Sequence, residues 1–410
     1  MTPSLWSETA APAPAAPPLA GAAACDIAII GAGIFGLAAA LALAAAGRRV
    51  IVLEAGTIGA GASGRNGGLV VPSLPRIGPA EVRAALPAAF AARLLALVAG
   101  GAAAVFDTIR RHGIDCDAVQ AGWLQPAHAA SRAPGLRARV AEWQAAGAGC
   151  VWLDAAAAAA HLGSTAFHGA LFDPSGGHLD PLGYTRGLAR AALGAGAAVH
   201  EASPVTAGHD QGGWRLVTPG GEVRAGCVLQ ATNAALPGLP CAAVRDSLVP
   251  LTVWQLATPP MPRCILPGDA AFSDTRNNLL ACRWTAGGRL VTGALALRPR
   301  WLARRLERVF PALGPVRFSH MWQGRAALTG DFLPRLMQPA PGWIAASACN
   351  GRGIVLSTLL GRALADYLLS GDPAALPVPI TPPRPFRAPA LARLVPRLLL
   401  PFGDWQDRRR

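Results

Sequence analysis

A glycine pattern close to the N-terminus constrains the fold of this chain more than any other feature. A short apolar run at residues 26–30, typical of a buried parallel strand, leads into three glycines and then into an alanine- and leucine-rich helical stretch. A second apolar run follows at residues 50–53 and ends in Glu54. The glycines are Gly31, Gly33 and Gly36. This succession of strand, glycine turn, helix, strand and acid predicts a dinucleotide-binding unit.

The positions of the glycines have a physical explanation. The first permits the tight turn between strand and helix, the second lets a pyrophosphate approach the backbone, and the third lets the helix lie close to the sheet. The start of the helix then offers free N–H groups and the positive end of its dipole to the anion. Glu54 lies where an acid accepts hydrogen bonds from an adenosine ribose. We expect nucleotide contacts at Gly31, Gly33, Ile34, Phe35, Gly36, Glu54 and Ala55.

Two simpler interpretations of this segment are less favoured. A lone glycine motif can be an ordinary turn of any α/β protein, but here strand, helix and acid all fall where nucleotide binding needs them. Residues 27–47 carry no charge and are long enough to span a bilayer. Because glycines at turn spacing divide them and arginines flank only one end, a buried strand and helix is the better interpretation.

The segment GASGRNGG at residues 61–68 resembles the flavin-contacting loop of FAD-dependent oxidoreductases of the D-amino-acid oxidase superfamily. The resemblance is closest to the gamma-glutamylputrescine oxidoreductase-like branch. It implies an α/β (α+β) fold, with a two-dinucleotide-binding-type FAD domain built on a parallel sheet and a substrate domain with a mixed or antiparallel sheet. It also implies FAD, which the glycine pattern alone does not distinguish from NAD. The implied FAD contacts here are Ala62, Ser63, Arg65, Asn66, Gly67 and Gly68.

Later segments resemble the same family. Val205 matches the place where the backbone brackets the adenine, and Ala231 and Thr232 match a strand end at which Asn233 replaces a common glycine. Asparagine tolerates the left-handed backbone that glycine adopts there. The loop at residues 348–354 resembles the one that opens the final helix, whose N–H groups face the negatively charged pyrimidine edge of reduced flavin. Its implied contacts are Asn350, Gly351, Arg352, Gly353 and Ile354.

The substrate site is less well marked. His178, in a GGH segment, is a candidate for titration near a substrate amine, although a histidine that fixes a loop is the favoured alternative. Strands expected at residues 248–257, 270–273, 278–284 and 289–295 would form a sheet over the flavin. Its pocket candidates are Trp254, Arg283, Trp284 and Trp322, with core tryptophans and a surface arginine as the alternative. We take His178, Arg283, Trp284 and Arg352 as the catalytic candidates.

Two departures from the family bear on the substrate. The chain contains no lysine, and Val355 stands where a relative's lysine grips the substrate carboxylate, so an anionic substrate would need an arginine such as Arg65, Arg283 or Arg352. Residues 323–325 lack the cysteine to which some relatives attach flavin, so we predict noncovalent FAD. No cysteine or histidine spacing indicates a metal site.

The resemblance implies oxidation of a C–N bond of an amine or amino acid. Hydride would pass from the carbon next to nitrogen to the flavin, the imine would hydrolyse to a carbonyl compound, and dioxygen would reoxidise the flavin with release of hydrogen peroxide. A second hypothesis is a membrane-associated dehydrogenase that passes electrons to quinone, with peripheral membrane contact through the arginine-rich tail at residues 384–410. A flavoprotein acting on RNA, suggested by the net charge of +14, is the least favoured, and no nucleic-acid partner is expected.

The expected domain organisation follows from these segments. Residues 1–24 are expected to be a flexible arm without a secretory pattern, in which Ser4, Leu5 and Trp6 are candidates to dock on the protein surface. Residues 25–78, 148–240 and 325–372 are expected to form the FAD-binding domain. Residues 79–147 and 241–324 are assigned to the substrate domain, and residues 373–410 to a basic tail. Eight unpaired-looking cysteines suggest a reducing, cytoplasmic environment. The sequence gives no indication of the oligomeric state.

Overall fold

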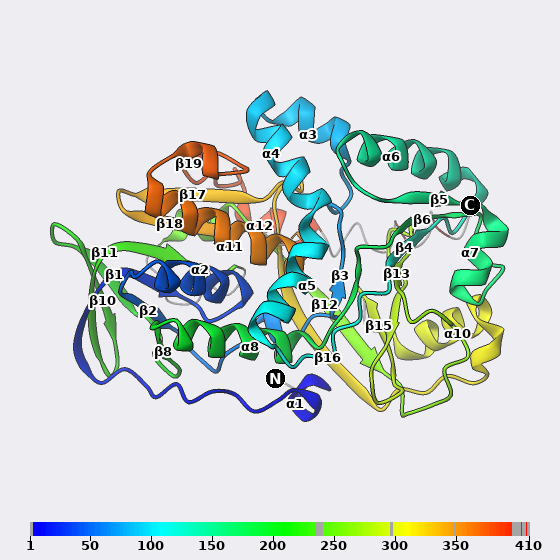
Figure 1. Cartoon of the computed structure of the whole chain (residues 1–410), viewed down its shortest axis with the longest axis horizontal. Coiled ribbons are helices and arrows are strands. Elements are labelled where there is room, and N and C mark those ends of the chain that lie inside the picture. The colour runs from blue at the N-terminus through cyan, green and yellow to red at the C-terminus, as the bar shows by residue number, and fades with distance from the viewer. Residues whose placement is uncertain are drawn as a thin grey trace.

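The fold consists of two β-sheets that lie side by side with helices around them (Figure 1). The computed structural model describes residues 3–233, 241–295, 298–347, 350–395, 403 and 407. Within these residues we call the nine-stranded sheet the parallel sheet and the eight-stranded one the antiparallel sheet, after the prevailing strand direction of each.

The parallel sheet contains the predicted nucleotide-binding unit. Its central strands β2, β1, β11 and β18 all run parallel, while β17 pairs antiparallel with β18, and a hairpin of β9 and β10 is attached to β11. In spatial order the strands are β19 (Ile380–Thr381), β17 (Arg335–Ala340), β18 (Trp343–Ser347), β11 (Gly221–Gln230), β1 (Gly21–Ile30), β2 (Val50–Leu53) and β8 (Ala198–His200), with β10 (Trp214–Thr218) and β9 (Ala207–Asp210) beside β11.

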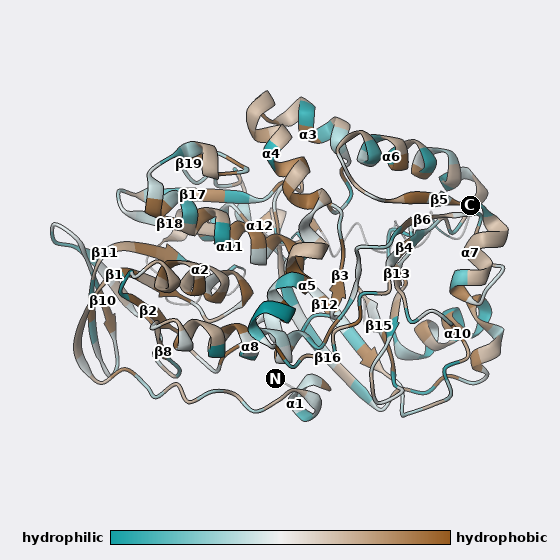
Figure 2. Ribbon diagram, viewed as in Figure 1, coloured by the Kyte–Doolittle hydropathy of each residue, from teal (hydrophilic) through white to brown (hydrophobic). Residues whose placement is uncertain are grey.

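Alternate residues of β1 supply two separate cores, as the period of a strand requires. Ile27 and Ile29 face a core built with three helices, α2 (Ile34–Ala45), α8 (Pro181–Gly194) and α11 (Gly353–Ser370). Ala28 and Ile30 face a second core that includes the β9–β10 hairpin. The ribbon of α2 is hydrophobic over most of its length, as a helix buried between sheet and neighbouring helices should be (Figure 2).

The antiparallel sheet is assembled from segments far apart in the sequence. Among its described strands, only β13 and β4 pair in parallel. In spatial order its strands are β16 (His320–Leu328), β12 (Val249–Ala257), β15 (Leu290–Ala294), β14 (Ala281–Trp284), β13 (Ala271–Ser273), β4 (Trp123–Pro126), β6 (Ala170–Asp173) and β5 (Val151–Leu153). A short pair, β3 (Leu69–Val70) with β7 (Gly177–His178), lies apart from both sheets.

The other helices cover the edges of the two sheets. The helix α10 packs on the core of the antiparallel sheet, while α4 and α5 pack against α11. The remaining helices are α1 (Trp6–Thr9), α3 (Pro79–Ala85), α4 (Ala88–Ala99), α5 (Gly101–His112), α6 (Ala133–Ala145), α7 (Ala155–Leu162), α9 (Ala242–Asp246), α10 (Pro299–Val309) and α12 (Pro389–Ala392), with short 3-10 turns at Ala62–Gly64, Ala130–Arg132, Pro311–Leu313 and Pro373–Ala375.

Two of the expected domain boundaries are wrong. Residues 148–240 were assigned to the FAD-binding domain, but β5 and β6 within them pair with the antiparallel sheet. The chain returns to the parallel sheet only after β7. At the other boundary, β16 continues to Leu328, so the antiparallel sheet extends past residue 324. Both boundaries depend on which strands pair over long sequence distances, and local residue patterns do not reveal the partner of a strand.

The N-terminal segment is packed against the protein rather than flexible. Strand β1 begins at Gly21, and Leu5 and Trp6 are buried against Trp322, whose ring meets that of Trp6 edge to face with centroids 5.6 Å apart. Thr9 donates a hydrogen bond of 2.6 Å to the carboxylate of Asp180. The expectation of a loose arm therefore fails for residues 3–24, because their few apolar side chains meet a matching surface elsewhere in the chain.

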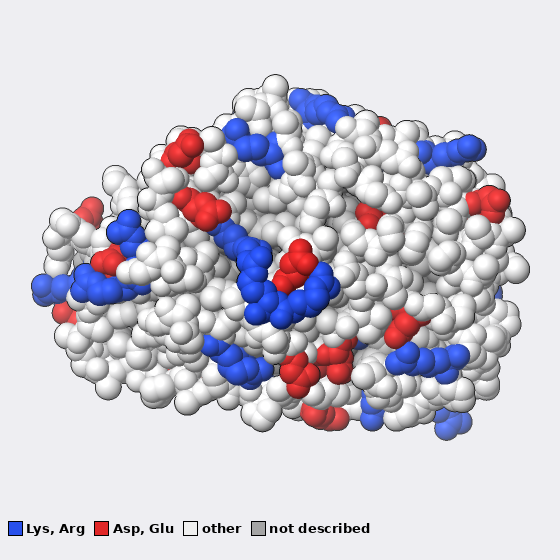
Figure 3. All heavy atoms as spheres, in the orientation of Figure 1, with Lys and Arg blue, Asp and Glu red and all other residues white. Residues whose placement is uncertain are grey.

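One described helix, α11, has the length and apolar composition of a membrane span, and α4 with α5 would reach the same criterion as a pair bent by 54°. Half of α11 is buried inside the protein, where it packs on α2 and α5. These are the contacts of a core helix. Arginines occur in separate groups over the molecular face drawn in Figure 3, with acidic side chains beside several of them.

Replacing Trp6 tests the docking of the N-terminal segment. Trp6→Ala should lower the free energy of unfolding by about 3 kcal/mol or more, because a fully buried tryptophan is lost. Trp6→Phe should cost only about 1 kcal/mol, the contribution of the indole N–H bond to the carbonyl of Asn66. Urea unfolding of the FAD-loaded protein measures both. Trp301→Ala, at a half-buried tryptophan of α10, is the control; a Trp6→Ala protein as stable as wild type would show that the segment is not docked.

Candidate functional site

The early glycine turn is closed by backbone contacts that leave no space for side chains. Gly31 has φ of 109°, a left-handed conformation that favours glycine. A Cβ on Gly36 would lie 2.2 Å from the carbonyl oxygen of Gly31 and 3.2 Å from the Cβ of Ala231. The first turn of α2 therefore presses directly on the ends of β1 and β11, as the sequence predicted for the third glycine.

Ser63 connects the 61–68 loop to the start of α2. Its hydroxyl accepts a hydrogen bond of 3.0 Å from the backbone N–H of Ile34, and a Cβ on Gly33 would lie 2.7 Å from the same oxygen. The chain thus brings two segments that were predicted separately to one point at the helix N-terminus. Phe35 follows in the first turn and is buried.

Glu54 lies at the end of β2 and faces the same turn. Its carboxylate accepts hydrogen bonds from the backbone N–H groups of Ala32, at 2.8 Å, and Gly56, at 2.9 Å. Burial raises the pKa of this carboxyl, against the effect of those two donors. Ala55 is exposed beside it. The position at the carboxyl end of a parallel strand is the one expected for an acid that binds a ribose.

The 61–68 loop is fixed internally by Asn66. Its side-chain amide donates to the carbonyls of Ala62, at 3.2 Å, and Ser63, at 2.8 Å, while its side-chain oxygen accepts from the N–H of Gly68 at 2.8 Å. These three bonds define the turn independently of any ligand. The asparagine therefore shapes the loop, and both ends of its side-chain amide bond to the backbone of the loop itself.

Strand β16 holds the same loop from the antiparallel sheet. The indole of Trp322 donates 3.0 Å to the carbonyl of Arg65, and Nε of Arg65 donates 2.5 Å to the carbonyl of Gln323. Arg65 is buried, and burial lowers the pKa of its guanidinium. These reciprocal bonds connect the flavin-type loop to the second sheet, so loop and sheet hold a fixed relative position.

Arg283 is a second link between the sheets, and it is buried rather than at the surface. Its guanidinium donates to the carbonyls of Gly67, at 2.8 Å, Leu179, at 2.8 Å, and Trp284, at 3.0 Å, and lies 4.6 Å above the ring of Trp6. Burial lowers its pKa to about 10, against the attraction of nearby aspartates, Asp180 first among them. The alternative of a surface arginine is wrong, and the contacts describe a residue that positions the loop.

The other substrate candidates differ in their surroundings. His178 is buried, and its Nε2 donates 3.0 Å to the carbonyl of Asp269 while Nδ1 has no partner among the described residues. Burial lowers the pKa of this histidine, so the ring is neutral near pH 7.

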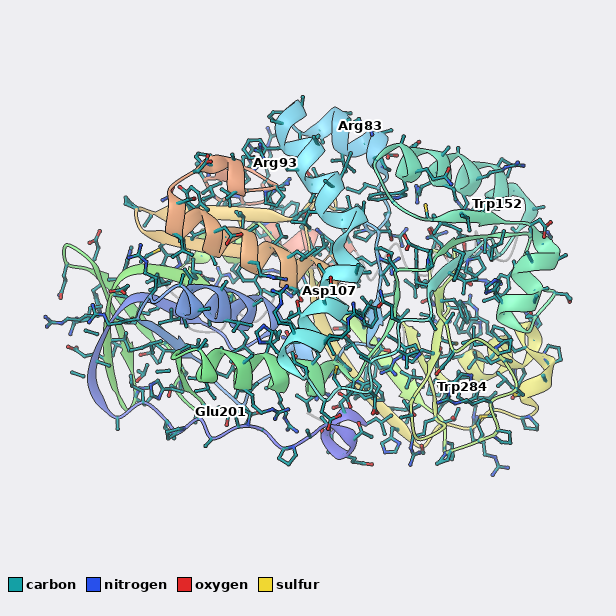
Figure 4. All side chains as sticks on the ribbon, in the orientation of Figure 1. Arg83, Arg93, Asp107, Trp152, Glu201 and Trp284 are labelled. Carbon is teal, nitrogen blue, oxygen red and sulfur yellow. The ribbon has the colours of Figure 1, made fainter. Side chains whose placement is uncertain are left out.

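Trp284 is a core residue whose indole donates to the carbonyl of Ile265 at 2.9 Å, and Trp254 is half-buried on β12. Figure 4 shows Trp284 in the antiparallel-sheet half of the molecule, at the opposite end from Glu201.

The late glycine loop begins at the carboxyl end of β18. Asn350 has φ of 37° and its side-chain oxygen accepts 2.8 Å from the N–H of Thr329, but its side-chain nitrogen has no partner among the described residues. The hydroxyl of Ser347, at the end of β18, is likewise buried without one. Gly351 has φ of 88°, and α11 begins at Gly353 and Ile354. Ala348 and Cys349, which the expected loop includes, lie outside the described residues.

The early and late loops meet at one edge of the parallel sheet. β1 and β18 run parallel on either side of β11, so the helices that follow them start at the same edge. α2 and α11 then lie side by side, and a Cβ on Gly361 would lie 2.6 Å from the carbonyl oxygen of Phe35. At the end of β11, Ala231 donates to the carbonyl of Ile30 at 2.8 Å. Asn233 has φ of 48°, the left-handed conformation expected for it.

These groups fit a bound dinucleotide. The N-termini of α2 and α11 provide backbone N–H groups, and the glycines beside them leave the backbone accessible. Near the N-terminus of α11, the hydroxyl of Ser347 and the side-chain nitrogen of Asn350 are buried without a partner among the described residues, so a polar ligand group could satisfy them. Val205 is buried between β8 and β9, on the side where the adenine half would lie. Thr232 accepts from the side chain of Gln230 at 3.3 Å.

Comparison with known proteins agrees with this geometry. The family described as FAD dependent oxidoreductase (DAO) matches residues 26–367. The chain belongs to this family. It is an FAD-dependent oxidoreductase, and its cofactor is FAD. The gamma-glutamylputrescine oxidoreductase of Escherichia coli (strain K12) is 32% identical over 363 residues, covering 85% of this chain and 84% of that protein.

Two further relatives extend the comparison. A probable oxidoreductase OrdL of Haemophilus influenzae is 30% identical over 374 residues, 87% of this chain and 85% of that protein. The crystal structure of glycine oxidase from Geobacillus kaustophilus superposes with a TM-score of 0.70 and 26% identity, covering 84% of this chain and 94% of that one. The predicted superfamily and fold class are confirmed.

Sequence reasoning missed the residues that support this DAO-family site from a distance. Trp6 donates 2.9 Å to the carbonyl of Asn66, and Thr329 holds Asn350, yet neither belongs to a motif. The hydroxyl oxygen of Ser273, in the antiparallel sheet, accepts a hydrogen bond from Arg352, which follows the parallel sheet. Among these supporting residues, Asp180 has a local signal, because an aspartate directly before a proline is typical of a helix N-cap. Its carboxylate caps α8 by accepting hydrogen bonds from the N–H groups of Leu182 and Gly183.

Adding one methyl group to the nucleotide turn should prevent FAD binding. Gly36→Ala would place a Cβ 2.2 Å from the carbonyl oxygen of Gly31, so α2 must move away from the sheet. We expect purified variant protein with less than a tenth of the wild-type flavin content, measured by flavin absorbance per protein and by FAD titration. Gly135→Ala, inside α6 and away from this turn, where a Cβ has nothing within 4 Å, is the matched control and should bind FAD normally. Normal FAD affinity in Gly36→Ala would contradict the packing described.

Proposed function

We propose that this FAD-dependent oxidoreductase oxidises a C–N bond of an amine or amino acid, giving an imine that hydrolyses to a carbonyl product. The names of two relatives, a gamma-glutamylputrescine oxidoreductase and a glycine oxidase, support this substrate class. One observation carries the proposal: the edge of the parallel sheet that holds both helix N-termini lies next to the antiparallel sheet. Arg65 and Arg352, from the two loops at that edge, donate hydrogen bonds to residues of the antiparallel sheet. A substrate between the two sheets would lie next to the cofactor.

Bound FAD supplies the hydride acceptor, and the protein's own residues position and shield the reactants. Burial holds the ring of His178 neutral, and its protonated nitrogen is already engaged by the carbonyl of Asp269. The ring is therefore not directed at an amine through that nitrogen. A substrate that enters as the neutral amine requires no strong base, so orientation between the two sheets provides most of the catalysis.

We propose dioxygen as the electron acceptor, with hydrogen peroxide as product. The alternative of quinone reduction at a membrane rests on the basic tail, and two described side chains of this tail are bound to the rest of the protein. Arg393 forms an ion pair of 2.7 Å with Asp246, and the buried carboxylate of Asp407 accepts 2.8 Å from the N–H of Asn277. Side chains engaged in this way are not available to a lipid surface. The RNA hypothesis gains no support from these contacts.

An amine panel tests the proposed reaction directly. Mixed anaerobically with amines and amino acids, the FAD-loaded protein should lose its flavin colour with at least one compound, and the same compound in air should yield hydrogen peroxide in proportion to the carbonyl product. Bleaching without peroxide, together with rapid turnover on a soluble quinone, would identify the dehydrogenase instead. A protein that holds FAD and is bleached by no C–N compound would refute the proposal.

The mode of flavin attachment is a separate prediction. Residues 323–325 form the middle of β16 and contain no cysteine, and Gly324 lies against Arg65. We expect acid precipitation to release all flavin into the supernatant, leaving a colourless pellet. Flavin fluorescence that remains with the denatured polypeptide on a gel would show a covalent bond.

A further inference from the structure

A cavity of about 520 Å³ lies beside α10, and arginine is the residue most common in its lining. The volume falls in the range of small-molecule binding sites. α10 packs on the core of the antiparallel sheet, at the end of the molecule away from α2 (Figure 1). None of the lining side chains belongs to the cofactor loops or to the substrate candidates. The described residues of the lining are Arg276, Trp301, Arg304, Arg305, Arg308, Val309 and Asp407.

Two of these arginines are exposed one turn apart on α10. Neither Arg304 nor Arg308 forms an ion pair with a described residue. Like charges at this spacing on a helix repel each other and destabilise it. The single acidic residue of α10 is Glu307, whose carboxylate accepts 2.8 Å from the backbone N–H of Val316. An anion between the two guanidinium groups would remove the repulsion that the helix itself leaves in place.

The other two arginines of the cavity are half-buried and already held in position. Arg305 donates 2.7 Å to the carbonyl of Asn278 and lies 3.9 Å above the ring of Trp301. Arg276 forms an ion pair with the buried carboxylate of Asp274. Contacts of this kind fix the direction of a guanidinium before any ligand arrives, which lowers the entropic cost of binding.

The charge of the lining is strongly positive. Among the described residues it contains four guanidinium groups and one carboxylate, that of Asp407. This carboxylate accepts hydrogen bonds from the backbone N–H of Asn277, at 2.8 Å, and from its side-chain nitrogen, at 2.9 Å. A concave surface lined by charges of one sign concentrates the electric field inside it. The cavity therefore favours a ligand with several negative charges.

We propose that this cavity binds a small anion with two or more linked phosphate groups, as in an inorganic polyphosphate or the phosphate chain of a nucleotide. A guanidinium binds a phosphate through two parallel hydrogen bonds, and linked phosphates can engage several arginines at once. Arg304 and Arg308 would close on the ligand from α10, while Arg276 would meet it from the segment between β13 and β14. The proposal is independent of the amine chemistry, because the ligand is not the compound oxidised.

Calorimetric titration of FAD-loaded protein at constant ionic strength tests the site. Bound FAD occupies the nucleotide turn, so the added anion must bind elsewhere. Tripolyphosphate should bind at least about tenfold more tightly than orthophosphate, because it can reach more than one guanidinium. Titration with ATP then separates the two sources of the phosphate chain. Tighter binding of ATP would support a nucleotide as the ligand, and equal affinity would support recognition of the phosphate chain alone.

Paired substitutions locate the binding. Arg304→Gln combined with Arg308→Gln should weaken tripolyphosphate by about 10- to 100-fold and leave the FAD content unchanged, since both side chains are exposed. Lysine at the same two positions should give an intermediate affinity, because the charge remains and the planar fork is lost. The matched control is Arg83→Gln combined with Arg137→Gln, which removes the same charge from exposed positions on α3 and α6. It should bind tripolyphosphate as wild type does.

Thermal unfolding provides a second measurement. Saturating tripolyphosphate should raise the Tm of the wild type and of the control, because a ligand that binds the folded state stabilises it. The Tm of the variant with both glutamines on α10 should change little.

Three results would overturn the inference. They are equal affinity of the wild type for tripolyphosphate and orthophosphate, unchanged tripolyphosphate binding in the variant with both glutamines on α10, and an equal loss of binding in the control. The second would place the anion elsewhere, and the third would show that only the net charge of the protein matters. The amine panel decides the proposed function separately, since none of these titrations contains an amine substrate.

Discussion

The close packing of α2 on the ends of β1 and β11 is the constraint on which the site depends. At Gly36 the helix approaches so near that a single methyl group would meet the carbonyl oxygen of Gly31. This contact fixes where the N-terminus of α2 points. Because β18 runs parallel to β1 and β11, α11 starts at the same edge and packs on α2 through Gly361. Two glycine contacts thus align both helix N-termini, and the positions of the backbone N–H groups that we propose for cofactor binding follow from that alignment.

Local patterns predicted the first two strands of the parallel sheet and the glycine loops that precede two of its helices. The glycine turn, the strand at Val50–Leu53 and the final helix all depend on residues near one another in sequence, and they appear where they were expected. Asp180 also carries a local signal, because it caps α8 from within its own segment. The left-handed backbone of Asn233 also follows from the residue type alone. Such features need no knowledge of what the segment packs against.

Features that depend on distant partners were not predictable. β5 and β6 have no local property that distinguishes the antiparallel sheet from the parallel one, and their pairing with β4 decides their place. The docking site of Trp6 was not predictable because its partners, Trp322 and Asn66, lie far away in the sequence. The sequence left a pocket position and a surface position open for Arg283 for a related reason: an arginine can be buried where several carbonyls converge, and no motif encodes their convergence.

Arginine is the residue that connects the two sheets, and this gives the absence of lysine a structural consequence. Arg65 and Arg283 each cross from one segment to backbone carbonyls of another, which a guanidinium does with several fixed donors while remaining charged when buried. Their donors meet carbonyl oxygens, which are neutral acceptors, so these two side chains contribute rigidity. Arg352 crosses the same junction and meets a wall that offers one hydroxyl oxygen and an aromatic face. Arg352 therefore differs from Arg65 and Arg283 in its partners, since it contacts a serine hydroxyl and an indole ring where they donate to backbone carbonyl groups.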